Sequence, residues 1–159
     1  MLKKIIIGTM LSSIAFAGIN STYKESGIYE TLDKLDNNKL IEKLVLHDQK
    51  KLPINVDSYT NIISIEDSNN SITYNIKISQ TDLETAMGQK VEFNQAFGQK
   101  LGTFSFKQIR SQLCTTNSSI YVIERGISYN YIYTYDNGDQ IIDFSIAIED
   151  CKDLNKIKE

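Results

Sequence analysis

The last third of the chain shows the clearest alternation of hydrophobic and polar positions. One run places a tyrosine at every second residue, at 129, 131, 133 and 135, and a second run alternates through Ile142, Phe144, Ile146 and Ile148. A period of two is that of a strand with one buried face. Asp136-Asn137-Gly138-Asp139 separates the runs, and its Asn-Gly pair is typical of a type I′ turn. The pattern predicts a β-hairpin over 127–148.

A second hairpin is predicted nearer the N-terminus. Residues 59–65 form one strand-like run, and residues 72–78 alternate between hydrophobic and polar side chains. The five residues between them, 66–70, are all polar and predict the turn.

Helical spacing marks the remaining segments. Ile28, Leu32 and Leu35, and then Leu40 to Val45, predict one or two amphipathic helices over 28–50, with Asn38 as a cap, and Pro53 ends this region.

Two capping-box patterns follow the first hairpin. Thr81-Asp82-Leu83-Glu84 predicts the start of one helix, which three glycines weaken, and Ser105-Phe106-Lys107-Gln108 predicts the start of a short helix ending at Cys114. A further turn of helix over 119–125 can end at Gly126 in the left-handed conformation.

The order of these elements predicts an α+β fold. An N-terminal helix is followed by a hairpin, by helices and by a second hairpin. The two hairpins can join into a four-stranded antiparallel sheet packed on helices.

The first 17 residues have the three parts of a secretory signal peptide. Lys3 and Lys4 form a basic start, 5–16 are mostly apolar, and Ala15-Phe16-Ala17 is a cleavage pattern. The apolar run spans about 18 Å as a helix, which is too short for a membrane core of about 30 Å. No cysteine follows it for lipid attachment. We expect cleavage after Ala17 and a periplasmic or secreted product.

The rest of the chain is expected to form one domain. Residues 18–27 read as a flexible leader, 28–152 as a single α+β domain and 153–159 as a polar tail. Without the signal peptide, 15 basic and 20 acidic side chains leave a net charge of −5. An acidic domain without a basic cluster does not suit nucleic acid, and no segment after the signal is long enough to span a membrane.

Two cysteines, Cys114 and Cys151, remain in the exported chain. An even cysteine count in an exported protein favours a disulfide, which would stabilise the fold by roughly 4 kcal/mol. Redox or metal chemistry would need a C-x-x-C pair or further ligands nearby.

Scattered residues over 50–151 resemble a group of small exported bacterial proteins of unknown function. The resemblance rests on Leu52-Pro53-x-x-Val56-Asp57-x-x-Thr60, Tyr74, Leu113-Cys114, Gly126, Tyr131-x-Tyr133-x-Tyr135-x-x-Gly138 and Cys151. It implies a periplasmic α+β domain with one disulfide, and it implies no activity.

No recognisable catalytic set emerges from the sequence. His47, the single histidine, lies in a charged segment without a serine-nucleophile motif, which favours a place on a helix surface. No metal or cofactor is expected. Paired carboxylates, Asp143 with Glu149 or Asp136 with Asp139, keep an envelope hydrolase open as an alternative. Calcium at 136–139 is another alternative, although the segment lacks the ligand spacing of an EF-hand and the turn already explains these residues.

The tyrosine-rich strand has two interpretations. Tyrosines suit binding surfaces, but alternating aromatics also suit the core of a sheet under helices, which we favour here. Tyr135, nearest the turn, and Asn137 are the candidates for an exposed binding surface. The function we predict is a non-enzymatic binding module of the envelope, either a secretion or assembly accessory or an inhibitor or immunity factor. Its partner would be another envelope or secreted protein.

The export signal gives a direct test. The protein expressed with its own leader should be recovered from the periplasm with Gly18 at its N-terminus, as read by N-terminal sequencing. A soluble envelope product that still begins at Met1 would show that the leader is not cleaved.

Overall fold

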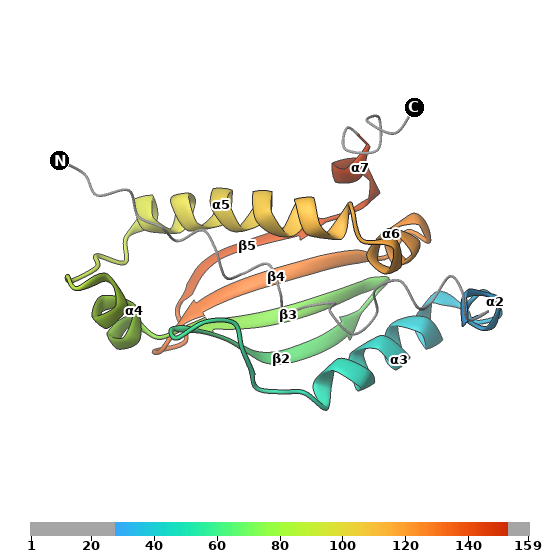
Figure 1. Ribbon diagram of the computed structural model, residues 1–159, viewed down its shortest axis with the longest axis horizontal. Helices are drawn as coiled ribbons and strands as arrows, with labels where there is room; N and C mark the ends of the chain where they lie inside the picture. Colours follow the sequence, from blue (N-terminus) through green and yellow to red (C-terminus); the bar gives the residue numbers. More distant parts are fainter. Residues whose placement is uncertain (1–27, 153–159) are drawn as a thin grey trace.

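The computed structural model describes residues 28–152, which form helices packed on one sheet (Figure 1). The predicted α+β class and the order of helices and hairpins are confirmed. The predicted signal peptide, leader and tail lie outside the described residues. The elements are α2 (Ile28–Leu32), α3 (Asn37–Gln49), β1 (Ile54–Asn55), β2 (Thr60–Ser68), β3 (Ser71–Ile78), α4 (Gln80–Met87), α5 (Gln95–Leu113), α6 (Asn117–Glu124), β4 (Ser128–Tyr135), β5 (Gln140–Ile146) and α7 (Ile148–Cys151).

The sheet differs from the predicted one in two respects. It has five strands in the order β1-β2-β3-β4-β5, because the short β1 pairs with β2 at one edge. Its central pair, β3 and β4, is parallel, whereas the pairs on either side are antiparallel. A parallel pair needs a long crossover connection, and α4, α5 and α6 supply it.

Both hairpin turns differ from the predicted ones. Asn69 and Asn70 both have positive φ, 33° and 63°, as a two-residue type I′ turn requires, and β2 extends through the predicted polar turn to Ser68. In the second hairpin only Gly138 has positive φ, at 89°. Its N–H donates to the carbonyl of Tyr135, which fits a three-residue loop closed by a left-handed glycine. The predicted type I′ turn at Asn137-Gly138 is therefore wrong.

Two helix caps lie earlier in the chain than predicted. Asp36, rather than Asn38, caps α3 by accepting a hydrogen bond from the N–H of Lys39 at 2.9 Å. Ser79, rather than Thr81, caps α4. The residue that precedes the first helical turn has extended backbone geometry, which leaves its side chain free to accept from that turn.

Helix α5 is one continuous helix of 19 residues and not the two segments predicted. Ser105 begins no helix; it lies in the interior of α5 and is fully buried. Gly98 and Gly102 do not break the helix because they are needed where it meets β5. A Cβ at Gly98 would lie 2.9 Å from the carbonyl oxygen of Ile141, and one at Gly102 would lie 2.7 Å from Cγ1 of Ile142.

The tyrosine-bearing strand faces the core, as favoured from the sequence. Tyr129, Tyr131 and Tyr133 are 1%, 4% and 1% exposed. The ring of Tyr131 stacks between Tyr74 of β3 and Phe144 of β5, with centroids 5.3 and 5.4 Å away. Along β3 and β4, buried residues alternate with partly exposed ones. One face of these strands is therefore buried under the helices, and the other face is partly open to solvent. Figure 1 shows α5 along β5 and α3 along β2 on either side of this core.

The predicted disulfide joins Cys114, at the end of α5, to Cys151 in α7, with Cα atoms 5.2 Å apart. Both residues are 1% exposed. Ile148 begins α7 rather than extending the last strand, so the bridge fastens this short helix to α5.

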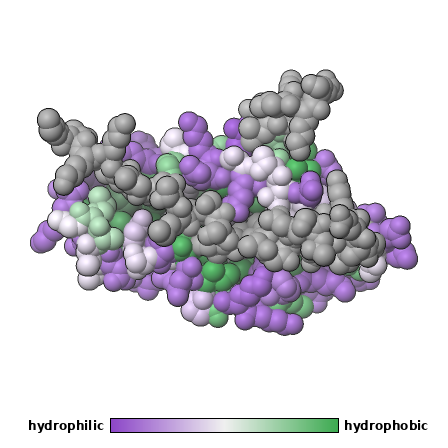
Figure 2. All heavy atoms as spheres, viewed as in Figure 1, coloured by the Kyte–Doolittle hydropathy of each residue, from purple (hydrophilic) through white to green (hydrophobic). Residues whose placement is uncertain are grey.

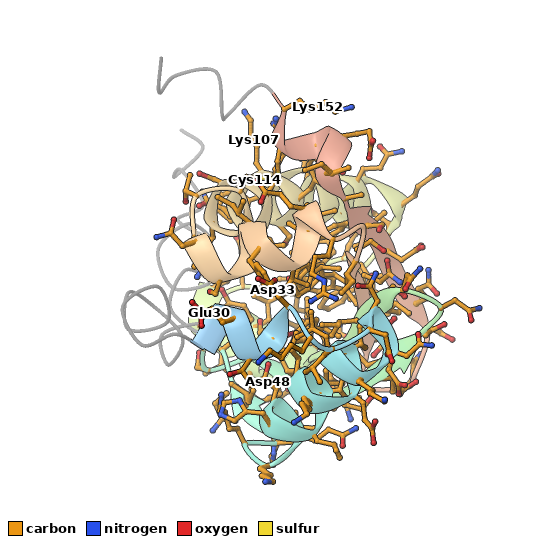
Figure 3. All side chains as sticks on the ribbon, turned by 90° about the vertical axis from the view of Figure 1, so that its right-hand side faces the viewer. Glu30, Asp33, Asp48, Lys107, Cys114 and Lys152 are labelled. Carbon is orange, nitrogen blue, oxygen red and sulfur yellow. A yellow bond between two sulfur atoms is a disulfide. The ribbon has the colours of Figure 1, made fainter. Side chains whose placement is uncertain are left out.

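Arg125 fixes the N-terminal helices to α6. Its guanidinium donates to the carbonyls of Leu32 and Leu35 and to the side chain of Asn37, whose amide in turn donates to the Arg125 carbonyl at 2.9 Å. Beside it, the Tyr121 hydroxyl donates to Asp33 at 2.7 Å, and Figure 3 shows Asp33 in this region, where α2 and α6 face the viewer.

On the face shown in Figure 2, the described residues are mainly hydrophilic, with hydrophobic residues showing in groups between them. Over residues 28–152, none of the helices combines the length and apolar character that a membrane span requires.

The contact between α5 and β5 predicts an unusual response to alanine. Gly98→Ala improves helix propensity by about 1 kcal/mol, but the new methyl must displace the strand backbone, and overpacking typically costs about 1–3 kcal/mol. We expect a net loss of about 1 kcal/mol in the free energy of unfolding, measured by urea denaturation. Gln99→Ala, an exposed neighbour on the same helix, is the control and should be close to neutral. A Gly98→Ala protein more stable than wild type would refute the close approach.

The buried tyrosines predict loss of stability in alkali. Burial raises the pKa of Tyr133 to about 12, and it also raises the pKa values of Tyr74, Tyr129 and Tyr131 well above the usual value. Tyrosines of the unfolded chain ionise near 10, so their contribution is complete below about pH 10 and declines as the pH rises towards the folded-state values. Each tyrosine should steepen the decline by up to about 1.4 kcal/mol per pH unit.

Urea unfolding measured from neutral pH to about pH 11 checks this expectation, with tyrosinate absorbance as the second signal. Tyr131→Phe removes one titrating group and should make the decline shallower. Ionisation of all the tyrosines near pH 10 in a protein that stays folded would contradict their burial.

Candidate functional site

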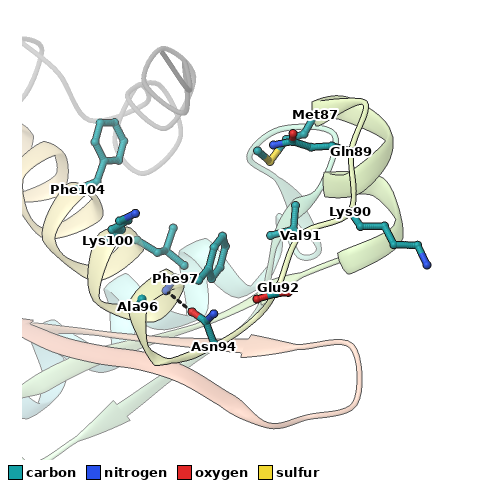
Figure 4. A pocket seen from close by; sticks show the side chains of 11 residues that line it. Met87, Gln89, Lys90, Val91, Glu92, Asn94, Ala96, Phe97, Lys100 and Phe104 are labelled. Atoms are coloured by element: carbon teal, nitrogen blue, oxygen red, sulfur yellow. Dashed lines mark hydrogen bonds between the residues drawn. The ribbon is translucent and has the colours of Figure 1, made fainter. Parts of the chain in front are cut away.

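A cavity of about 510 Å³ opens between the end of α4, the connecting segment 88–94 and the outer side of α5 (Figure 4). This volume lies in the range of ordinary ligand pockets. The wall is mainly apolar, and polar side chains stand at its rim. The lining residues are Met87, Gln89, Lys90, Val91, Glu92, Asn94, Ala96, Phe97, Lys100, Leu101 and Phe104.

The segment 88–94 is held against α4 by one carboxylate. Gly88 ends α4 with φ of 65°, and the chain then turns back so that Glu84 accepts hydrogen bonds from the N–H of Val91 and from Gln80, both at 3.1 Å. These bonds, led by that from Gln80, hold the pKa of Glu84 below its usual value. The position of Val91 in the wall thus depends on a hydrogen bond from its own backbone.

The opposite wall is a stripe along α5. Ala96, Lys100 and Phe104 are four residues apart and share one side of the helix, with Phe97 and Leu101 beside them. Asn94 starts the helix by accepting a hydrogen bond from the N–H of Phe97 at 3.0 Å, drawn in Figure 4. The same helix therefore presents its glycines to β5 and an apolar stripe to the cavity.

An aromatic chain connects the cavity to the last hairpin. Phe93 makes edge-to-face contacts with Phe97 at 4.9 Å and with Tyr135 at 4.6 Å between ring centroids. Tyr135 is only partly buried, and burial raises its pKa with a smaller contribution from Asp139. Tyr135 thus supports the cavity wall from behind and is not among the residues that line it.

Asn137, the other predicted binding residue, lies exposed in the β4–β5 turn. Its side chain accepts from the N–H of Asp139 at 3.0 Å and donates to the Asp139 carboxylate at 2.7 Å. These bonds shape the turn. A binding role for Tyr135 and Asn137 stays a prediction.

The rim of the cavity carries more positive than negative charge. Lys100 stands on the α5 wall, Lys90 extends outward from the 88–94 segment, and Glu92 is the one acidic residue of the lining (Figure 4). The first turn of α5, which includes Ala96, adds the positive end of a helix dipole. This excess is local, because the whole chain has a net charge of −3.

The candidate carboxylates are engaged separately at the surface. Asp136 pairs with Lys77 and accepts from the N–H of Gln80, and Asp139 is bonded within its turn. Asp143 accepts from Gln140, and Glu149 lies in α7 beside Lys152. None of the four is among the residues that line the cavity between α4 and α5.

His47 lies on the surface of α3, as predicted, with its Nδ1 3.2 Å from Oδ1 of Asp48. Asp48 is buried, and its carboxylate also accepts hydrogen bonds from Nζ of Lys51 at 2.8 Å and from the hydroxyl of Tyr74 at 3.4 Å. This group ties the end of α3 to the tyrosine core. Within residues 28–152 there is no group of three or more His, Cys, Asp or Glu side chains that could hold a metal ion.

The cavity itself was missed from the sequence. The helical spacing of Met87, Phe97 and Leu101 indicates burial but not that they line a cavity, and no pattern singles out Val91 or Phe104. One signal was available: α5 has more apolar residues than a single core-facing stripe needs, because Phe97 and Phe104 lie off the face that carries Gly98 and Gly102. Apolar residues outside the core-facing stripe indicate that the helix has a second contact surface.

Comparison with known proteins finds similarity in fold and none in sequence family. No protein-family model and no curated protein sequence matches the chain. Its fold is similar to that of a candidate secreted protein from Pseudomonas aeruginosa, with a TM-score of 0.58 and 11% identity over 73% of this chain and 93% of the other.

Two pilotins of type II secretion systems are also similar in fold. EpsS from Vibrio vulnificus has a TM-score of 0.55 and 18% identity over 73% of this chain and 92% of its own. AspS from Vibrio cholerae has a TM-score of 0.51 and 15% identity over 79% of this chain and all of its own. At these identities the likeness concerns the fold.

Proposed function

We propose that this chain is an exported, non-enzymatic binding module of the bacterial envelope that acts as a secretion or assembly accessory. The cavity between α4 and α5 carries this proposal. It is lined by apolar side chains and bordered by polar ones, which is the composition of a site that recognises a partner. The shared fold with two secretion pilotins supports the accessory role over that of an inhibitor or immunity factor.

The location follows from the same proposal. A cleaved leader delivers the domain beyond the cytoplasmic membrane, where a disulfide between Cys114 and Cys151 can form and persist. The partner is another envelope or secreted protein.

A hydrolase using carboxylates is the weaker candidate. Acid–base chemistry on a glycan requires two carboxyl groups that face one substrate in a cleft. Asp136, Asp139, Asp143 and Glu149 instead have separate partners outside the cavity.

The binding module can be tested by capture of its partner. Tagged mature protein, incubated with envelope extract and mildly crosslinked, should recover a specific protein identified by mass spectrometry. Val91→Asp places a charge in the apolar wall and should reduce this recovery by about tenfold or more, because burying an unpaired carboxylate is strongly unfavourable.

Gln108→Asp is the matched control, because it adds the same charge on an exposed position of α5 outside the cavity. Thermal melts should show both variants folded. Equal recovery by Val91→Asp and Gln108→Asp would exclude the cavity as the binding site, and failure of wild type to recover any partner would count against the binding module.

A further inference from the structure

We propose that the α4–α5 cavity receives a short amphipathic helix of its partner, with an apolar face flanked by acidic side chains. This inference rests on the proposed function and specifies the chemistry of the segment that docks. Three features of the cavity carry it: the elements that form its walls, its length and the charge at its rim.

The walls favour a helix over an extended segment. All of the lining residues belong to α4, to the 88–94 segment or to α5, and none belongs to a strand. An extended peptide in this cavity would have no strand edge to pair with, so its buried backbone N–H and C=O groups would lack partners. A helix satisfies these groups internally and buries only its side chains.

The length of the apolar wall fits two turns of helix. From Ala96 to Phe104 the lining stripe of α5 rises by about 12 Å. A docked helix would present anchors at positions i, i+3 or i+4, and i+7 to such a wall. Phe97, Leu101 and Phe104 provide the apolar surface on α5, and Met87 and Val91 provide it on the opposite side.

The charges at the rim set the sign of the flanking residues. Lys90 and Lys100 outnumber Glu92 among the lining residues, and the first turn of α5 adds partial positive charge. Acidic side chains at the border of the apolar face would complement this rim, whereas basic ones would face Lys100 and the positive end of α5. Complementary charge at a rim sets specificity and the rate of association more than affinity.

Two synthetic peptides test the inference with purified mature protein. Both are amphipathic helices of about 15 residues with the same leucine face, and they differ only in having glutamate or lysine beside that face. Wild type should bind the glutamate peptide about tenfold more tightly than the lysine peptide by fluorescence anisotropy. Because these contacts are exposed, the preference should shrink as salt is raised.

Lys100→Glu should abolish or reverse the preference, whereas the control Lys107→Glu, an exposed α5 residue outside the cavity, should keep it. Equal or tighter binding of the lysine peptide by wild type, a preference unchanged in Lys100→Glu, or no binding of either peptide would overturn the inference. Concentration-dependent dimerisation of wild type that is lost in Val91→Asp would also overturn it, by assigning the cavity to a second copy.

The peptide experiment can fail while the proposed function still holds. If Val91→Asp loses the envelope partner while the lysine peptide binds as well as the glutamate peptide, the cavity remains the binding site and the acidic helix is wrong.

Discussion

The parallel pairing of β3 with β4 is the constraint on which the rest of the molecule depends. Eight residue pairs, from Ser71 with Ser128 to Ile78 with Tyr135, align the two hairpins side by side. The chain must therefore return from the end of β3 to the start of β4. Helix α5, with 19 residues, rises about 28 Å, which matches the roughly 26 Å of an eight-residue strand. The candidate site follows from this crossover, because α4 and the 88–94 segment lie where the return begins.

Much of the local structure could be predicted from the sequence, and the reasons are physical. Alternation found the strands because one sheet face is buried, and capping residues indicated helix starts to within a few positions. The parallel pair had no local signal, because it joins strands separated by about fifty residues of chain. By propensity Gly98 and Gly102 only weaken a helix, and propensity alone does not reveal that a helix approaches a strand backbone closely. Ser105 resembled a cap by type and spacing, but its side chain points into the core.

The candidate site was harder to predict than the fold. Hydrophobic residues at helical spacing indicate burial, but they do not say whether the burial is against the protein's own sheet or against a partner. Phe97 shows the difficulty: it contacts Phe93 on one side and lines the cavity on the other. Tyr135 was singled out for its place near the turn, and it does lie at this end of the molecule, but behind the wall and not in it.

The central claim is that the tyrosine strand is core and that the α4–α5 cavity is the surface a partner uses. Methyl NMR spectra of the mature protein, titrated with the acidic amphipathic peptide, test it most directly. The account predicts shifts at Met87, Val91 and Leu101, with the buried Ile72 and Ile76 of the sheet unchanged. Shifts confined to Ile132, on the partly exposed face of the sheet, would contradict it.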